Sequence, residues 1–133
     1  REKLEGPLRD VALANGLGII PFYGLANGFL TGKYRTREDL GKSTRGGRAE
    51  GYLEGKGMRI LAALDRLHAE TGAPLAAIAL AWTNVQPGIA ATLASATSVA
   101  QLDELTEAMN LTLNAEQRAL LDEASAETVP AGA

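Results

Sequence analysis

Hydrophobic residues recur with helical spacing in five segments of the chain. In one of them Met58, Leu61 and Leu64 fall on the same side of a helix, and Gly72 follows its last turn. In another, Pro74 opens a run whose hydrophobic residues repeat in the same way. This spacing predicts helices over residues 7–15, 57–71, 74–85, 98–110 and 114–124.

Two short apolar runs interrupt the helices, at residues 17–22 and 89–94. Neither alternates with polar residues, which is typical of parallel strands that are buried on both faces. Strands that alternate with helices favour an α/β fold with parallel pairing. Two strands alone would leave both edges of the sheet unpaired, and the sequence begins with Arg1 rather than Met. We therefore expect the chain to be part of a longer protein.

Residues 24–57 are rich in glycine and charge, so we expect a long loop with one short helical turn. Its basic residues from 33 to 48 are Lys33, Arg35, Arg37, Lys42, Arg45 and Arg48. The segment Gly28–Lys33 has two glycines and a lysine, a combination that can hold an anion. It is not a Walker P-loop, because the glycine spacing is one residue short and Tyr34 stands where Ser or Thr is needed. An anion site and an ordinary glycine-rich turn both stay open.

Ser98 and Gln101 have the spacing of a capping box, which predicts the start of a helix. Gln101 and Glu104 share a face near that start, where a helix that follows a strand can also hold a nucleotide. His68 is the single histidine, and without cysteine it cannot form a transition-metal site, so a capping or surface role is predicted. Trp82 is predicted to lie in the core.

Composition narrows the classes of function. The 133 residues carry a net charge of −3, which gives no support for nucleic-acid or membrane partners. No apolar run approaches the roughly 20 residues of a membrane span. The sequence has no cysteine, which excludes disulfides and a cysteine nucleophile and fits a cytoplasmic protein. We expect no bound metal, and the residues form no complete catalytic constellation.

Four segments resemble successive parts of aldo/keto reductases, in the same order along the chain. They are residues 18–35, which resemble the seventh strand and its loop; 79–82, the seventh outer helix; 94–104, the eighth strand and the next helix; and 110–122, the closing helix. The resemblance implies a partial (β/α)8 TIM barrel, an α/β fold with strands seven and eight and their helices. It covers residues 1–126, and residues 127–133 are expected to form a frayed tail.

The resemblance also implies an NAD(P)H-dependent oxidoreductase that reduces aldehydes or ketones to alcohols, with NADP expected and NAD as the alternative. The family's catalytic Asp, Tyr, Lys and His come from the first half of the barrel, and no counterpart is expected in this chain. The expected partners are a small carbonyl substrate of the whole protein, and either the missing N-terminal half of the barrel or a second copy. A nucleotide-binding or interaction module without catalysis is the alternative function.

By position, ten residues would line the cofactor. Phe22 would stack on the nicotinamide; Leu25, Ala26, Asn27, Lys33 and Arg45 would surround the pyrophosphate; Ser95 and Thr97 would face the adenosine phosphate; and Gln101 and Glu104 would approach the adenine. Gly24 replaces the proline that is usual in the family, which should loosen the loop. No arginine or lysine occupies positions 95–98, so the preference for NADP comes from the family alone.

Overall fold

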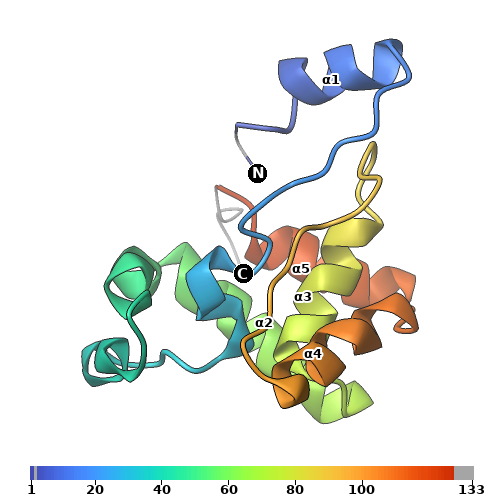
Figure 1. The fold of residues 1–133 in the computed structure, drawn as a ribbon. Coiled ribbons are helices and arrows are strands. Elements are labelled where there is room, and N and C mark those ends of the chain that lie inside the picture. Colours follow the sequence, from blue (N-terminus) through green and yellow to red (C-terminus); the bar gives the residue numbers. More distant parts are fainter. Residues whose placement is uncertain (2, 128–133) are drawn as a thin grey trace, which may run out of the picture.

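The computed structural model describes residue 1 and residues 3–127, and shows a helical body with an outlying first helix (Figure 1). The α-helices are α1 (Pro7–Ala14), α2 (Lys56–Thr71), α3 (Leu75–Asn84), α4 (Val99–Thr106) and α5 (Ala115–Ala124). The 3-10 helices are η1 (Ala26–Thr31), η2 (Arg37–Lys42), η3 (Gly46–Tyr52) and η4 (Glu107–Met109). The five predicted helices are confirmed, although the one expected over residues 98–110 is divided into α4 and η4.

Side-chain hydrogen bonds fix the starts of α4 and α5. At α5, the Asn114 side chain accepts from Gln117 N and the Gln117 side chain accepts from Asn114 N, both at 2.9 Å. At α4, Ser98 Oγ accepts from Gln101 N at 3.3 Å, but the Gln101 side chain accepts from Thr97 N. The capping box predicted at Ser98 and Gln101 is therefore only half-formed, because Gln101 bonds one residue further back.

The core lies where α2, α3 and α5 pack together, and η1 and η3 add side chains to it. Its largest fully buried side chains are Tyr34, Phe29, Leu61, Leu64, Leu67 and Ile78. Trp82 is only half-buried, so its prediction as a core residue placed it too deep. Its indole Nε1 donates to Asp122 Oδ1 at 3.0 Å, which keeps the polar end of the ring near the surface.

The two predicted strands are extended segments that run side by side, blue and gold in Figure 1, but the described residues contain no strand. A single parallel bridge joins Ile19 to Ile89. Ile19 N donates to the carbonyl of Gly88 at 2.8 Å, and Leu93 N donates to that of Pro21 at 3.0 Å. The expected burial on both faces is wrong, because residues such as Leu17, Ile20 and Leu93 are more than half exposed. A parallel pair without flanking strands cannot build a full ladder.

The segment from residue 24 to residue 57 is more ordered than the predicted loop with one turn. It forms three 3-10 helices, η1, η2 and η3. Phe29 and Ala49 anchor it because both are fully buried in the core. At η2 the Asp39 carboxylate accepts a hydrogen bond from Thr36 N, which caps the helix. The segment lacks the hydrophobic periodicity of a longer helix. Burial of two side chains and capping by Asp39 stabilise it instead.

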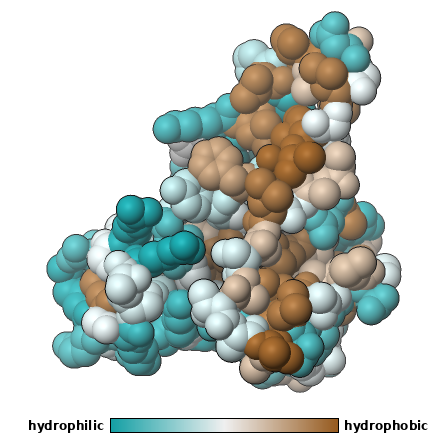
Figure 2. All heavy atoms as spheres, in the orientation of Figure 1, coloured by the Kyte–Doolittle hydropathy of each residue, from teal (hydrophilic) through white to brown (hydrophobic). Residues whose placement is uncertain are grey.

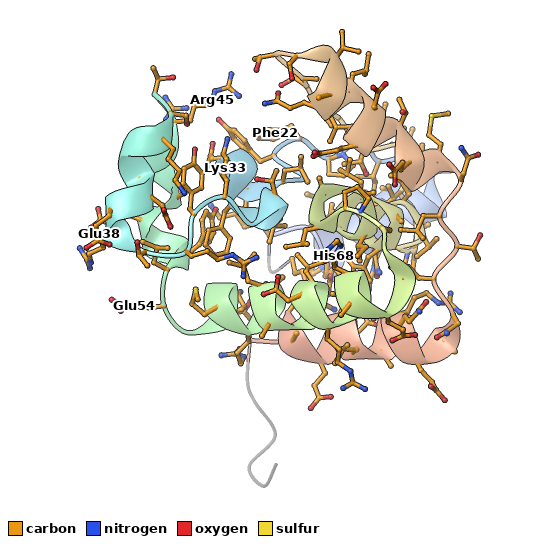
Figure 3. The ribbon with its side chains drawn as sticks, turned by 90° about the horizontal axis from the view of Figure 1, so that it is seen from below. Phe22, Lys33, Glu38, Arg45, Glu54 and His68 are labelled. Atoms are coloured by element: carbon orange, nitrogen blue, oxygen red, sulfur yellow. The ribbon has the colours of Figure 1, made fainter. Side chains whose placement is uncertain are left out.

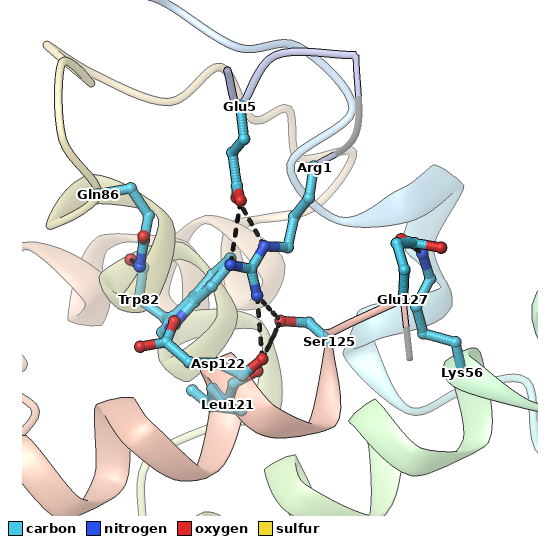
Figure 4. A network of polar contacts seen from close by, with 9 residues as sticks. All are labelled: Arg1, Glu5, Lys56, Trp82, Gln86, Leu121, Asp122, Ser125 and Glu127. Atoms are coloured by element: carbon cyan, nitrogen blue, oxygen red, sulfur yellow. Dashed lines mark hydrogen bonds and ion pairs between the residues drawn. The ribbon is translucent and has the colours of Figure 1, made fainter. Parts of the chain in front are cut away.

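The first residues are fastened to the end of α5 by Arg1 (Figure 4). Its guanidinium donates to Glu5 at 2.6 Å, to Ser125 Oγ at 2.6 Å and to Asp122 O at 3.0 Å. By contrast, α1 buries none of its own residues, and Figure 2 shows hydrophobic side chains in a strip that descends from α1. The frayed tail expected over 127–133 lies outside the described residues, apart from Glu127, which pairs with Lys56.

Candidate functional site

A constrained turn follows the first extended segment and contains three of the predicted cofactor residues. Tyr23, Ala26 and Asn27 have positive φ angles of 60°, 48° and 58°. Hydrogen bonds hold the turn, because Ala26 N donates to Tyr23 O at 2.8 Å and Gly28 N donates to Leu25 O at 2.9 Å. Non-glycine residues adopt this conformation at a cost and concentrate at functional sites. Leu25, Ala26 and Asn27 therefore lie where the backbone itself is unusual.

Gly24, at the start of this turn, has a role that the sequence did not indicate. A Cβ at this position would lie 2.6 Å from Thr92 Cγ2 and 3.3 Å from Leu80 Cδ2. Such distances leave no room for a side chain, so the missing side chain permits close packing against α3 and the second extended segment. From the sequence, Gly24 was expected to loosen the loop. In the structure it allows the turn to pack closely against its neighbours.

The Lys33 ammonium occupies a space bounded by Tyr34 and Gly28. Its Nζ lies 5.0 Å from the centre of the Tyr34 ring, and a Cβ on Gly28 would lie 3.0 Å from the same Nζ. Tyr34 is fully buried, and its hydroxyl lies 2.5 Å from Ser43 Oγ. In the part of the chain that the structure describes, no carboxylate pairs with Lys33. The ammonium therefore keeps its charge available to an anion.

Other basic residues of the loop are neutralised by carboxylates. The ion pairs are Arg35 with Asp65, Arg37 with Glu50 and Lys42 with Asp39. The hydrogen bonds from Arg35 lower the pKa of Asp65, and those from Lys42 and two backbone amides lower the pKa of Asp39. Among the described residues Lys33, Arg45 and Arg48 have no ion pair. The free positive charge of the loop is thus limited to a few side chains.

Phe22, Lys33 and Arg45 lie toward the same edge of the molecule, as Figure 3 shows. The Phe22 side chain is 69 % exposed, and its ring centre lies 4.7 Å from that of Tyr23. Figure 3 places Glu54 and His68 away from this edge. In this view an exposed aromatic ring and two cations without an ion pair among the described residues lie on one side of the molecule.

The second group of predicted residues surrounds the start of α4. Ser95, Thr97, Gln101 and Glu104 are all exposed. Thr97 N and Thr97 Oγ1 both donate to Gln101 Oε1, at 2.9 and 3.0 Å. The Gln101 carbonyl is therefore occupied within the chain, and its amide group is the part that could meet a ligand.

Two grooves on the described surface lie away from these residues. One, of about 370 Å³, lies between α2 and α5 and is lined by Arg59, Arg66, Leu120 and neighbouring residues. Another is lined by Arg37, Glu50 and Glu54 beside η3. Neither includes any of the ten predicted cofactor residues. Among the described residues no group of three or more potential ligands could hold a metal ion, and no helix there is both long and apolar enough to cross a membrane.

The structure adds residues that the sequence reasoning missed. The spacing of Thr36 and Asp39 resembles a capping box and could have indicated that Asp39 is anchored. Nothing in the sequence indicates that Asp65 meets Arg35, because 30 positions separate them. His68 was predicted correctly, since its Nδ1 lies 2.8 Å from Ala73 O, just beyond the end of α2.

Comparisons with known proteins identify the family of the chain. Residues 2–126 match the model of the aldo/keto reductase family. The chain is 32 % identical over 123 residues to an L-glyceraldehyde 3-phosphate reductase of Escherichia coli O157:H7, and 30 % identical over 123 residues to the protein of that name in strain K12. Each alignment covers 87 % of this chain and 36 % of the relative, so the chain spans about a third of the length of these relatives.

The family fold is a (β/α)8 barrel, and the described residues agree with part of such a barrel only in outline. The helices occur in the expected order, and the two extended segments touch through one parallel bridge. The family model matches nearly the whole chain, and both relatives are at least 30 % identical to it over 123 residues. The chain belongs to the aldo/keto reductase family.

Proposed function

We propose that the chain supplies the pyrophosphate-facing part of a nicotinamide-cofactor site in a carbonyl-reducing oxidoreductase. Its family and the reductases that it resembles support this reading. The observation that carries it is the Lys33 ammonium, which is unpaired among the described residues although its basic neighbours Arg35, Arg37 and Lys42 are neutralised. An isolated cation beside a constrained backbone is suited to one localised anion.

The residues present fit a dinucleotide. Gly28 lets the Lys33 ammonium lie close to the backbone of the turn, because a Cβ there would lie 3.0 Å from Lys33 Nζ. Arg45, the residue before η3, would approach the same group, and the exposed Phe22 ring would stack on the nicotinamide. Leu25, Ala26 and Asn27 would line the pyrophosphate with their backbone. When bound, the cofactor supplies the hydride.

The adenosine end of the proposed site is formed by the start of α4. Ser95 and Thr97 would face the adenosine phosphate, and Gln101 and Glu104 would approach the adenine. Because positions 95–98 hold no arginine or lysine, a 2′-phosphate would have to be held by other residues. NADP remains the first candidate from the family, with NAD as the alternative.

The substrate that we propose is an aldehyde or ketone, and the relatives' name suggests a phosphorylated aldehyde. We assign no proton donor among the described residues, and we propose that this group comes from the remainder of a longer protein. We also propose that this remainder, or a second copy, covers the exposed extended segments.

Titration of the full chain with NADPH and with NADH, followed by cofactor fluorescence, tests the proposal. Lys33→Met should weaken binding by about tenfold, because one charge-assisted contact contributes about 1.5–3 kcal/mol. Arg66→Met removes the same charge from the groove between α2 and α5 and should leave binding within about twofold. Equal losses in the two variants would contradict a localised anion site.

Oxidation of NADPH in the presence of a reactive aldehyde separates the two candidate functions. The chain alone should bind the cofactor without turning it over, and a longer protein that contains it should reduce the aldehyde. If the longer protein binds the cofactor but shows no turnover, the nucleotide-binding module without catalysis is the better description. Clear turnover by the chain alone would contradict the assignment of proton transfer to residues outside it.

A further inference from the structure

We propose that Arg35 and Lys42 are positioning residues that hold the two peptide groups on either side of Lys33 and thereby direct its ammonium toward the bound anion. The inference rests on the proposed function, in which Lys33 contacts the pyrophosphate. It assigns a role to two cations of the basic loop whose charges are already neutralised by carboxylates. It also explains why the loop contains more cations than one anion site requires.

Arg35 holds the peptide group before Lys33. Its Nε donates to Gly32 O at 2.8 Å, and its two terminal nitrogens donate to the carboxylate of Asp65 at 2.6 and 2.7 Å. A planar guanidinium with all three nitrogens engaged has little freedom to rotate. Asp65 belongs to α2, which supplies Leu61, Leu64 and Leu67 to the core. The Gly32 carbonyl is therefore tied to a helix that contributes several side chains to the core.

Lys42 holds the peptide group after Lys33. Its Nζ donates to Lys33 O at 3.3 Å and lies 2.6 Å from Asp39 Oδ1. The other oxygen of Asp39 accepts from Arg35 N at 2.7 Å and from Thr36 N at 2.9 Å. One carboxylate thus joins Lys42 to the backbone that follows Lys33. With both flanking carbonyls held, the backbone dihedrals of Lys33 are fixed from two sides.

The side chain of Lys33 is guided by two further contacts. The Tyr34 ring lies on one side of its ammonium, and Gly28 leaves room on another. Tyr34 cannot move easily, because it is fully buried and its hydroxyl meets Ser43. The pKa values of Asp65 and Asp39 are lowered by their partners, so both carboxylates are charged at neutral pH and cancel the charge of Arg35 and Lys42. Of the three cations Lys33, Arg35 and Lys42, only Lys33 then offers its charge to the ligand.

NADPH titration of the full chain with Arg35→Lys tests the inference. A lysine can keep the ion pair with Asp65, but it cannot also donate to Gly32 O with a fixed fork. Affinity should fall about fivefold, a loss typical of directly coupled neighbours. The matched control is Arg37→Lys, because Arg37 is paired with Glu50 in the same loop and no backbone carbonyl accepts from it among the described contacts. The control should bind as the unchanged chain does.

Two further variants separate positioning from general stability. In the double variant Lys33→Met with Arg35→Lys, the second change should cost nothing more, because Arg35 acts only through Lys33. In the exchanged pair Arg35→Asp with Asp65→Arg, the ion pair is restored but Gly32 O lacks its donor. Thermal stability should then recover while affinity stays low. Additive losses in the first case, or recovered affinity in the second, would overturn the inference.

The proposed function can fail independently of this inference. If the unchanged chain binds neither NADPH nor NADH, the proposed site is contradicted. Backbone 15N relaxation at Lys33 and Tyr34 then decides about positioning, because Arg35→Lys should lower the order parameters of these two residues and leave those of α2 unchanged. Unchanged order parameters would overturn the positioning role in that case.

Discussion

At the residue scale, neighbouring cations of one loop have different roles because their partners differ. Lys33 and Arg35 are two positions apart, yet among the described residues only Arg35 of the two meets a carboxylate, that of Asp65 on α2. The sequence shows the type and spacing of these residues, so the candidate anion site could be predicted. It does not show which cation is neutralised, since Asp65 is 30 positions from Arg35. The distinction between binding and positioning depends on the folded chain.

Two structural constraints at position 28, a positive φ and a close neighbour, favour glycine over a larger residue. Its φ of 89° is in the left-handed region, and a Cβ would lie 3.0 Å from Lys33 Nζ. Gly28→Ala should lower the free energy of unfolding by about 1–2 kcal/mol, measured by urea denaturation. Gly51→Ala is the control, because its backbone is ordinary and no atom lies within 4 Å of an added Cβ. Equal destabilisation by the two changes would contradict the explanation.

At the element scale, the ion pair between Arg35 and Asp65 fastens the basic loop to α2. The pKa of Asp65 is lowered chiefly by its hydrogen bonds with Arg35, with a smaller effect of the nearby His68. A lowered pKa stabilises the folded chain above the unfolded pKa of about 3.9 and loses this effect as the pH falls through the folded value.

Asp65→Asn should therefore destabilise the chain at pH 7 by about 0.5–1 kcal/mol, a range set by the partial exposure of the pair. The difference between the variant and the unchanged chain should shrink as the pH falls below about 4. Urea denaturation at several pH values measures both quantities. A difference that stays constant down to pH 2 would show that the carboxylate charge is not the cause.

The two capped helices provide a second comparison between elements. At α5 the capping box is complete, and its Gln117 is buried and donates to Glu70 Oε1 at 2.8 Å. At α4 only Ser98 accepts a hydrogen bond from the helix. Asn114→Ala should cost about 1 kcal/mol or more, and Ser98→Ala should cost less. Thermal or urea denaturation of both variants tests the order, and a larger effect at Ser98 would contradict it.

The elements themselves could mostly be predicted from the sequence. Hydrophobic periodicity and capping residues are local signals, and they gave the five helices with boundaries close to those observed. For residues 24–57 the sequence predicted one short helical turn and not three 3-10 helices, because each is short and is held by tertiary contacts, such as the buried Phe29 and Ala49. The capping box predicted at Ser98 was only half correct, because the Gln101 side chain accepts a hydrogen bond from Thr97 N instead of Ser98 N.

At the scale of the whole molecule, the helical body and the extended segments should differ in stability. Amides of α2 and α3 lie in a packed core, whereas few amides of residues 17–22 have a partner among the described contacts. Hydrogen exchange should therefore be slow in α2 and fast at Ile20 and Phe22, with Ile19 more protected through its bond to Gly88 O.

Protection at Ile20 or Phe22 that rises with protein concentration would instead indicate pairing with a second copy. Protection that does not depend on concentration would contradict the open pair of extended segments. In a longer protein that contains the chain, the same amides should become slow, because further parallel strands would supply their partners.

The sequence by itself determined the helices, the apolar character of residues 17–22 and 89–94, and the resemblance of the ordered motifs to the aldo/keto reductases. These properties depend on residues that are close together along the chain, so they can be recognised without the tertiary structure. Only the tertiary structure decided that the two apolar segments meet through one bridge, and that no described carboxylate pairs with Lys33 while Arg35 and Lys42 hold its backbone. Those outcomes depend on contacts between distant residues, whose pairing is fixed only when the helices pack around a common core.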